Sequence, residues 1–115
     1  MAKTFETAEC EKKDYLKTRY YKTNADLVMS FIEKDLVKRG LVLVSSNREY
    51  GEISATASDY EITAKVFQYN ATEVAVDLYL YSNFLFDFGK SRRIIEDFYE
   101  NLNKNFQLIG LALHR

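Results

Sequence analysis

The residues most suggestive of chemistry form a Gly-Lys-Ser run at 89–91, which resembles the end of a phosphate-binding loop. Such a loop needs another glycine five residues before its second glycine, so that backbone N–H groups can surround a phosphate. Position 84 is Phe84, so this arrangement is not expected. The Asp-Phe-Gly run at 87–89 copies a metal-binding tripeptide of protein kinases, but a chain of 115 residues is too short for a kinase. We interpret the segment as a loop followed by a capped helix.

Other polar residues do not suggest catalysis either. The single cysteine, Cys10, cannot form an intrachain disulfide, and His114 has no neighbouring nucleophile or set of metal ligands. A general acid-base pair would need a pocket that shifts its pKa values, whereas the central carboxylates fall near predicted turns. These carboxylates are Glu49, Glu52, Asp59 and Glu61. We therefore expect a non-catalytic protein with no cofactor, no catalytic residue and no metal site.

Aromatic residues at outward positions of two predicted strands are more informative. Each ring can bury about 150 to 250 Å², so four rings approach the patch size that monomers seldom leave uncovered. This predicts a partner-binding surface. Alternatively, Lys65, Asp77 and neighbouring ring edges shield the rings as ordinary cross-strand pairs, and the sequence leaves both interpretations open. The four residues are Phe67, Tyr69, Tyr79 and Tyr81.

Nearly regular alternation of apolar and polar residues over 53–82 predicts half-buried strands. A two-residue turn at 58–59 pairs Ala55 with Ile62, both inward. For the next hairpin, a three-residue loop at 71–73 keeps inward residues opposite inward ones by pairing Val66 with Leu78. The same register pairs Phe67 with Asp77. We also predict strands at 15–21, 41–44 and 51–57, whereas 108–115 is either a last strand or an irregular tail.

Two amphipathic helices accompany these strands. The first begins at the capping residues 23–24 and ends at Gly40, and the second begins with Ser91 as its cap. Each has one apolar stripe at helical spacing. The first stripe contains Leu27, Val28, Phe31, Ile32 and Leu36, and the second contains Ile94, Ile95, Phe98, Leu102 and Phe106.

Because each helix has a single apolar stripe, both are expected to cover the same sheet face. The predicted fold is α+β, a two-layer sandwich with an antiparallel sheet of four to five strands and two helices on one face. Its order is strand, helix, three or four strands, helix. Residues 1–14 are charged and aperiodic, so we expect a flexible N-terminal arm before a single domain at 15–115.

The composition limits which cellular location and which classes of partner we expect. Sixteen basic and 17 acidic residues give a net charge of −1, so no attraction to nucleic acid or to anionic membranes is expected. The first residues lack the apolar stretch of a signal peptide, and no apolar run approaches the length of a membrane span. We expect a cytoplasmic protein with no membrane partner.

Residues 35–43 and 47–55 carry a weak family resemblance. A helix ends in Gly40, a short strand follows, and a turn with an acidic residue and Gly51 introduces an Ile-x-Ala strand. This resembles a small bacterial α+β domain, ordered strand-helix-meander-helix, that is found alone or in lipoproteins. The resemblance implies a fold over about residues 16–106 and no functional residue.

Three functional hypotheses follow. The first is a protein-interaction or self-association module that binds itself or another protein through Phe67, Tyr69, Tyr79 and Tyr81. The alternative is a binder of a small apolar or amphipathic molecule between the sheet and the helices, where Ala55, Ala57 and Ala64 leave room. Single-stranded nucleic acid stacked on the aromatic rings ranks third, because the positive field is missing.

Overall fold

A single antiparallel sheet of seven strands organises the chain. The computed structural model describes residues 3–9 and 11–112, so Cys10 and His114 lie outside the described residues. The strand order is β3-β4-β5-β6-β2-β7, with β1 also paired to β6. The strands are β1 (Lys3–Glu6), β2 (Arg19–Lys22), β3 (Val42–Asn47), β4 (Glu52–Thr56), β5 (Tyr60–Gln68), β6 (Glu73–Ser82) and β7 (Gln107–Leu111). The helices are α1 (Ala25–Lys38), α2 (Lys90–Asn105) and the short 3-10 helix η1 (Asp14–Leu16).

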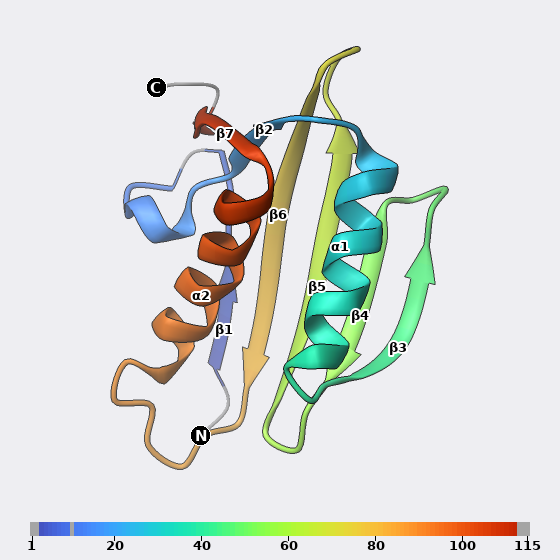
Figure 1. Cartoon of the computed structure of the whole chain (residues 1–115). Coiled ribbons are helices and arrows are strands. Elements are labelled where there is room, and N and C mark those ends of the chain that lie inside the picture. Colours follow the sequence, from blue (N-terminus) through green and yellow to red (C-terminus); the bar gives the residue numbers. More distant parts are fainter. Residues whose placement is uncertain (1–2, 10, 113–115) are drawn as a thin grey trace.

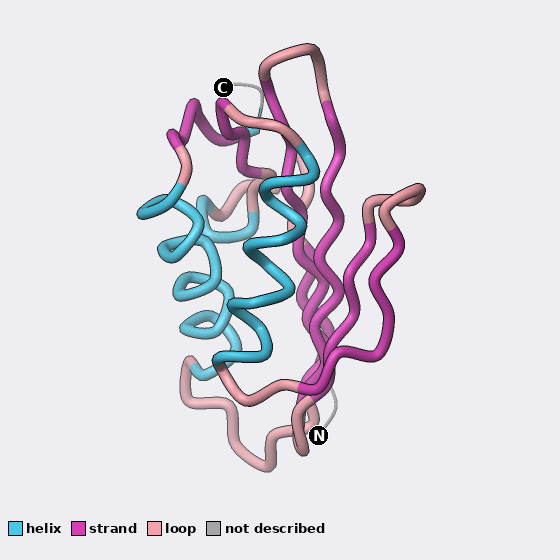
Figure 2. Tube along the Cα trace, turned by 45° about the vertical axis from the view of Figure 1, so that its right-hand side comes forward, coloured by secondary structure: helices cyan, strands magenta, loops and turns pink. Residues whose placement is uncertain are grey.

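Both long helices lie on one face of the sheet, as Figures 1 and 2 show. Helix α1 packs over β3, β4 and β5, and α2 packs over β6 and β7. The core between the layers contains the inward residues of the strands, such as Ile53, Ile62 and Leu80, against Phe98 and Leu102 of α2. The α+β class and the antiparallel sheet are confirmed.

The prediction of four to five strands was too low. Strand β6 pairs with β5 along one side. On its other side β2 pairs with residues 73–76 of β6, and β1 pairs with residues 79–82. The prediction of a flexible arm at 1–14 is wrong for residues 3–6, which form β1. This strand supplies the hydrogen bonds that residues 79–82 of β6 would otherwise lack. Phe5 is the one half-buried residue of β1 and the other three are exposed, so the sequence shows too little alternation to predict this strand.

The N-terminal and C-terminal elements also differ from expectation. Instead of one strand at 15–21, the chain forms η1 and then the shorter β2, whose Tyr21 is fully buried. Of the segment 108–115, which the sequence left open, residues 108–111 belong to β7 and 113–115 lie outside the described residues. Strand β7 pairs with β2 across a register shift between Tyr20 and Tyr21. Two short strands thus extend the sheet where the sequence pattern was weakest.

The two central hairpins were predicted with different success. Ala55 lies opposite Ile62 and the Ala57 N–H donates to the Tyr60 carbonyl at 2.8 Å, as predicted. In the β5–β6 hairpin the inward and outward faces are as predicted, but the register is not. Val66 pairs with Val76, because the Tyr69 N–H donates to the Glu73 carbonyl and closes a loop of residues 70–72.

This loop is stabilised by a local hydrogen bond that alternation does not reveal. The Asn70 side chain accepts from the Thr72 N–H at 3.0 Å, which is a turn that asparagine favours. The loop therefore closes one residue earlier than predicted, and every pair shifts by two residues. Phe67 lies opposite Ala75 and not opposite Asp77.

Helix α1 matches its prediction at both ends. The Asn24 side chain accepts from the Leu27 N–H at 3.0 Å, and Gly40 follows the helix with φ +91°. Within the stripe, however, Leu27 is 56% exposed and Met29 is buried in its place. No helix in the described part of the chain is long and apolar enough to cross a membrane.

Helix α2 begins two residues earlier than predicted. Its N-cap is Gly89, with φ +80°, and Ser91 lies inside the first turn. The Asp87 carboxylate accepts the Ser91 N–H at 3.0 Å and the Ser91 hydroxyl at 2.7 Å, so Asp87, two residues before the N-cap, provides the capping hydrogen bonds expected from Ser91. Tyr99 also joins the buried stripe of α2.

Candidate functional site

The outer sheet face, which is the side turned away from the helices, holds all the residues predicted to bind a partner except Tyr69, which follows β5. On β5 and β6 the outward residues form four cross-strand rows. From one end of the hairpin to the other, these rows are Glu61 with Tyr81, Thr63 with Tyr79, Lys65 with Asp77, and Phe67 with Ala75.

The four predicted aromatic residues divide into two groups on this face. Tyr79 and Tyr81 lie at one end, while Phe67 and Tyr69 lie at the other, and the charged row of Lys65 and Asp77 separates them. Ala75, opposite Phe67, is four residues from Tyr79, or about 13 Å along the strand. The rings therefore do not form one continuous patch, and the shifted hairpin register is the reason.

Tyr69 has a role within the fold. Its ring meets the ring of Tyr20 edge to face, with 5.4 Å between centroids, and Tyr20 is only 5% exposed. The Tyr20 hydroxyl donates to Glu9 Oε2 at 2.9 Å. Burial first, and then the Glu9 carboxylate, raise the pKa of Tyr20 well above its ordinary value. The shielding interpretation applies to this pair, which sequence spacing did not reveal, while Phe67 beside it remains exposed.

Tyr79 and Tyr81 lie among hydroxyl-bearing side chains. Tyr79 is half-buried opposite Thr63, and Tyr81 is exposed opposite Glu61 on one side and Thr4 on the other. The hydroxyls of Ser54 and Thr63 are hydrogen-bonded across the strands at 2.9 Å. We call Thr4, Ser54, Thr63, Tyr79 and Tyr81 the tyrosine patch. Tyrosine and small hydroxyl residues provide contact area and adaptable hydrogen bonds at low conformational cost.

The hydrogen bonds of the Asp77 carboxylate indicate a structural role. Its Oδ1 accepts the hydroxyls of Thr7 at 2.6 Å and Thr18 at 2.7 Å. Thr7 in turn accepts the Leu78 N–H at 2.8 Å. This cluster lies between the end of β1 and the start of β2, where regular strand pairing with β6 is interrupted. The carboxylate thereby connects two separate strands to the centre of the sheet.

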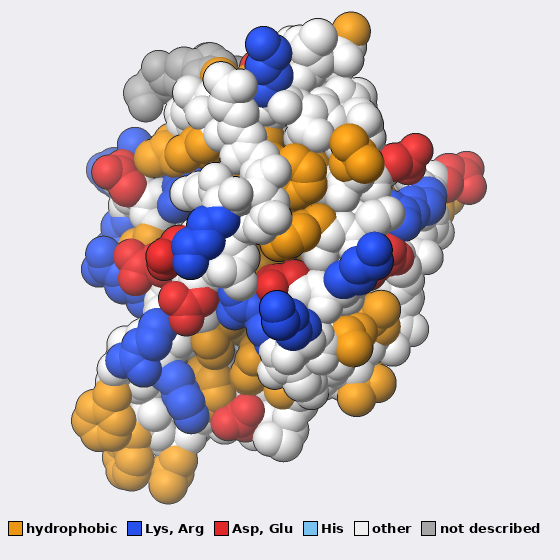
Figure 3. Space-filling view, in the orientation of Figure 1, with side chains coloured by type: hydrophobic (Ala, Val, Ile, Leu, Met, Phe, Trp, Pro, Cys, Tyr) orange, Lys and Arg blue, Asp and Glu red, His pale blue; other side chains and the backbone are white. Residues whose placement is uncertain are grey.

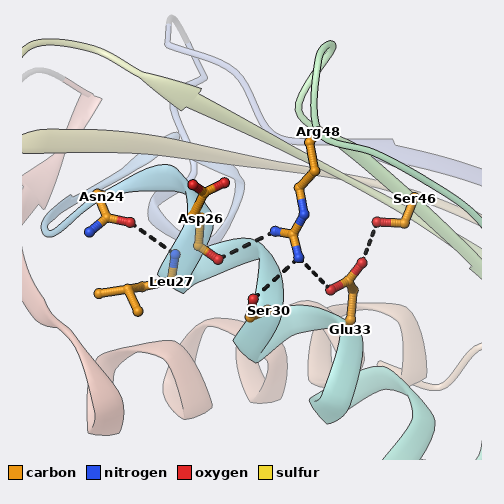
Figure 4. Close-up of polar contacts among 7 residues, drawn as sticks. All are labelled: Asn24, Asp26, Leu27, Ser30, Glu33, Ser46 and Arg48. Atoms are coloured by element: carbon orange, nitrogen blue, oxygen red, sulfur yellow. Dashed lines mark hydrogen bonds and ion pairs between the residues drawn. The ribbon is translucent and has the colours of Figure 1, made fainter.

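A second polar cluster, shown in Figure 4, attaches the β3–β4 hairpin to α1. Arg48 donates through Nη2 to Glu33 at 2.9 Å and to Ser30 at 3.2 Å, and through Nη1 to the Asp26 carbonyl at 3.3 Å. The Ser46 hydroxyl also donates to Glu33. Because the guanidinium is engaged on the helix, we interpret this cluster as a clamp that holds the hairpin over α1.

Neither a metal site nor a phosphate-binding loop emerges from the described residues. No group of three or more His, Cys, Asp or Glu side chains within them is placed to hold a metal ion. The run at 89–91 forms the first turn of α2 after a left-handed glycine, in a loop closed by Asp87. Between sheet and helices, Met29, Phe98 and Tyr99 are at most 1% exposed, so large side chains fill the space proposed for a small ligand.

Comparison of the chain with family models, curated proteins and solved structures found no match. The fold itself therefore defines the class, an α+β protein with a seven-stranded antiparallel sheet and two long helices. The resemblance of residues 35–43 and 47–55 to a bacterial domain stays a prediction.

Proposed function

We propose that this chain is a non-catalytic, cytoplasmic protein-interaction module that self-associates through the tyrosine patch on its outer sheet face. The observation that carries the proposal is the exposure of Tyr81, 39%, on a sheet face opposite both helices (Figure 2). Half-exposed tyrosines among hydroxyls are typical of protein contact surfaces, where aromatic rings supply most of the binding energy.

The order of charges along β5 favours a second copy of this chain as the partner. Glu61 and Lys65 are both exposed and lie on either side of Thr63 on the outer face. Two sheets packed face to face about a two-fold axis, running across the strands through the Thr63–Tyr79 row, bring Glu61 of each copy over the partner's Lys65. These Glu61–Lys65 pairs are self-complementary, as two-fold symmetry requires, while Glu6, beside Tyr79 in the axial row, faces its own copy. Stacked sheets lie about 10 Å apart, a distance that these two long side chains span together.

Charge exchange tests this arrangement. In Glu61→Lys or Lys65→Glu alone, two pairs of like charges face each other across the interface. We expect the dissociation constant of the dimer to rise about tenfold. In the double variant the pairs are restored with opposite polarity, so dimerisation returns. Sedimentation equilibrium across a concentration series measures all four proteins.

Two further variants complete the experiment. Tyr81→Lys removes a ring from the tyrosine patch and is expected to weaken the dimer. Lys34→Glu on the exposed side of α1 matches the charge change of Lys65→Glu and is a control that leaves the dimer unchanged. A wild type that remains monomeric throughout the series contradicts self-association. A double variant as impaired as the single variants contradicts the proposed axis.

The other two hypotheses have less support. The ligand alternative lacks room for the reasons given above. For nucleic acid, Lys65 is outnumbered on the outer face by Glu6, Glu61 and Asp77, which repel a phosphate backbone. No observation favours either one over protein binding.

A further inference from the structure

The loop between β6 and α2 exposes large apolar side chains at one end of the molecule. Leu85 is 80% exposed, Phe86 65% and Phe88 85%. The rings of Phe86 and Phe88 lie side by side, with 5.6 Å between centroids. We call these three residues the apolar tip. In Figure 3 hydrophobic side chains gather at the lower left, where this loop runs in Figure 1.

The fold does not need a phenylalanine at position 88. Phe88 has φ +49°, a left-handed conformation that costs a bulky residue energy and that asparagine or glycine adopts more easily. Its side chain is 85% exposed and its ring lies against Phe86, which is itself 65% exposed, so little apolar surface is buried to offset this cost. The ring is therefore better explained by a contact made outside the chain.

Cations surround the base of this loop. Lys90, Arg92 and Arg93 lie in the first turn of α2 and are exposed, and Lys3 lines the same surface hollow as the apolar tip. The first turn of α2 contains no acidic residue. Since a helix N-terminus already carries a positive partial charge, cations there raise the local potential at some cost to the helix. Figure 3 shows Lys and Arg side chains next to the hydrophobic group.

The acidic groups nearby offset only part of this field. The Asp87 carboxylate is turned toward α2 and accepts both hydrogen bonds from Ser91. Lys90 lies 3.9 Å from Asp59, and Arg92 lies 3.3 Å from Glu96. Such exposed pairs are weak and are easily exchanged for other anions.

We propose that the apolar tip inserts into the interface of an anionic lipid bilayer, while Lys3, Lys90, Arg92 and Arg93 contact the lipid phosphates. Exposed phenylalanine and leucine above basic residues are the combination that stabilises proteins at such interfaces. A bilayer suits this surface better than a protein pocket, because the three side chains protrude and offer no hydrogen-bonding group to fix an orientation. The net charge of −1 predicted no membrane attraction, but the fold concentrates cations at one end. The inference is independent of dimerisation.

Sedimentation with lipid vesicles tests the proposal on the full chain. We expect the wild type to bind vesicles of equal parts phosphatidylcholine and phosphatidylglycerol, and to bind pure phosphatidylcholine about tenfold or more weakly. Phe88→Asn is expected to lower partitioning to the anionic vesicles about tenfold. Because asparagine tolerates this backbone conformation, thermal unfolding of the variant is expected at an equal or higher temperature, so loss of binding does not reflect loss of fold.

The electrostatic part is tested by Lys90→Glu with Arg93→Glu. Glutamate in the first turn of α2 favours the helix dipole, so the double variant is expected to fold while its partitioning falls about tenfold or more. Tyr50→Asn, which removes another highly exposed ring in the β3–β4 hairpin, and Lys38→Glu at the end of α1 are the controls and leave partitioning unchanged.

Three outcomes would overturn the proposal. The first is a wild type that binds neither kind of vesicle. The second is equal loss of binding in the controls and in the tip variants. The third is the absence of vesicle binding together with self-association that depends on Phe88. The last outcome would assign the tip to a protein contact. Retained vesicle binding in Tyr81→Lys, the variant expected to have a weakened dimer, separates this test from that of the tyrosine patch.

Discussion

At the scale of single residues, Gly51 shows how closely the backbone of one hairpin approaches the next strand. It has φ +66°, and a Cβ placed on it would lie 2.1 Å from the Val66 carbonyl oxygen. The Val66 N–H donates to the Gly51 carbonyl at 2.7 Å, so this approach is also a hydrogen bond. Gly40 shares a positive φ, but nothing lies within 4 Å of its missing Cβ. The two glycines separate the effect of backbone conformation from that of crowding.

We predict that Gly51→Ala lowers the free energy of unfolding by about 3 kcal/mol, because strain at positive φ adds to a clash with backbone that cannot rotate away. Gly40→Ala involves conformation alone and is expected to cost about 1 kcal/mol. Urea denaturation of both variants measures the difference. Equal costs would show that the β3–β4 hairpin moves freely away from β5.

At the scale of elements, the start of α2 depends on a side chain outside the helix. The Asp87 carboxylate accepts two hydrogen bonds from Ser91 at the positive end of the helix dipole. The hydrogen bond from the Ser91 hydroxyl, followed by that from its N–H, lowers the pKa of Asp87. A lowered pKa in the folded state means that the ionised carboxylate stabilises the fold. This contribution is complete above the ordinary pKa of aspartate, about 4, and is lost as the pH falls through the folded value.

Asp87→Asn is therefore expected to be less stable than wild type at neutral pH, by about 0.5 kcal/mol, since it keeps an acceptor but loses the charge. As the pH falls through the lowered pKa of Asp87, the two proteins should converge in stability, because the wild-type carboxyl then also becomes neutral. Urea midpoints across this pH range provide the measurement. A difference that stays constant down to the lowest pH would mean that the charge contributes nothing.

At the scale of the whole molecule, β6 connects all parts of the sheet. It pairs with β5 on one side and with β1 and β2 on the other, and its inward residues Val74, Val76 and Leu80 are fully buried. The edge strand β3 pairs on one side only and exposes most of its residues. Stability is therefore distributed unevenly, from a central strand to an open edge.

Hydrogen exchange is expected to follow this order. The amides of β6 and of the facing part of β5 should exchange slowest, near the limit of global unfolding, whereas those of β3 should exchange first through local opening. Mass spectrometry of peptides over time distinguishes these strands. Uniform protection of β3 and β6 would indicate that the molecule opens only as a whole, or that another chain covers the β3 edge.

Much of the fold was predictable from local pattern. Alternation placed Ile62, Ala64 and Val66 on the buried face, and Asn24 with Gly40 marked the ends of α1, because these signals depend on neighbours a few residues apart. The pattern missed β1 and left β7 open, because both strands are short and take their stability from pairing with residues distant in the chain.

The candidate sites depended on these distant contacts. A side-chain hydrogen bond at Asn70 shifted one hairpin by two residues and thereby divided Phe67 and Tyr69 from Tyr79 and Tyr81. Likewise, the apolar side chains at 85–88 and the cations of α2 are near neighbours in sequence, yet Lys3 joins them only through the pairing of β1 with β6. Periodicity in the sequence predicts which face of the sheet a residue occupies. Its neighbours on that face depend on strand register and on packing between segments that are distant in the chain.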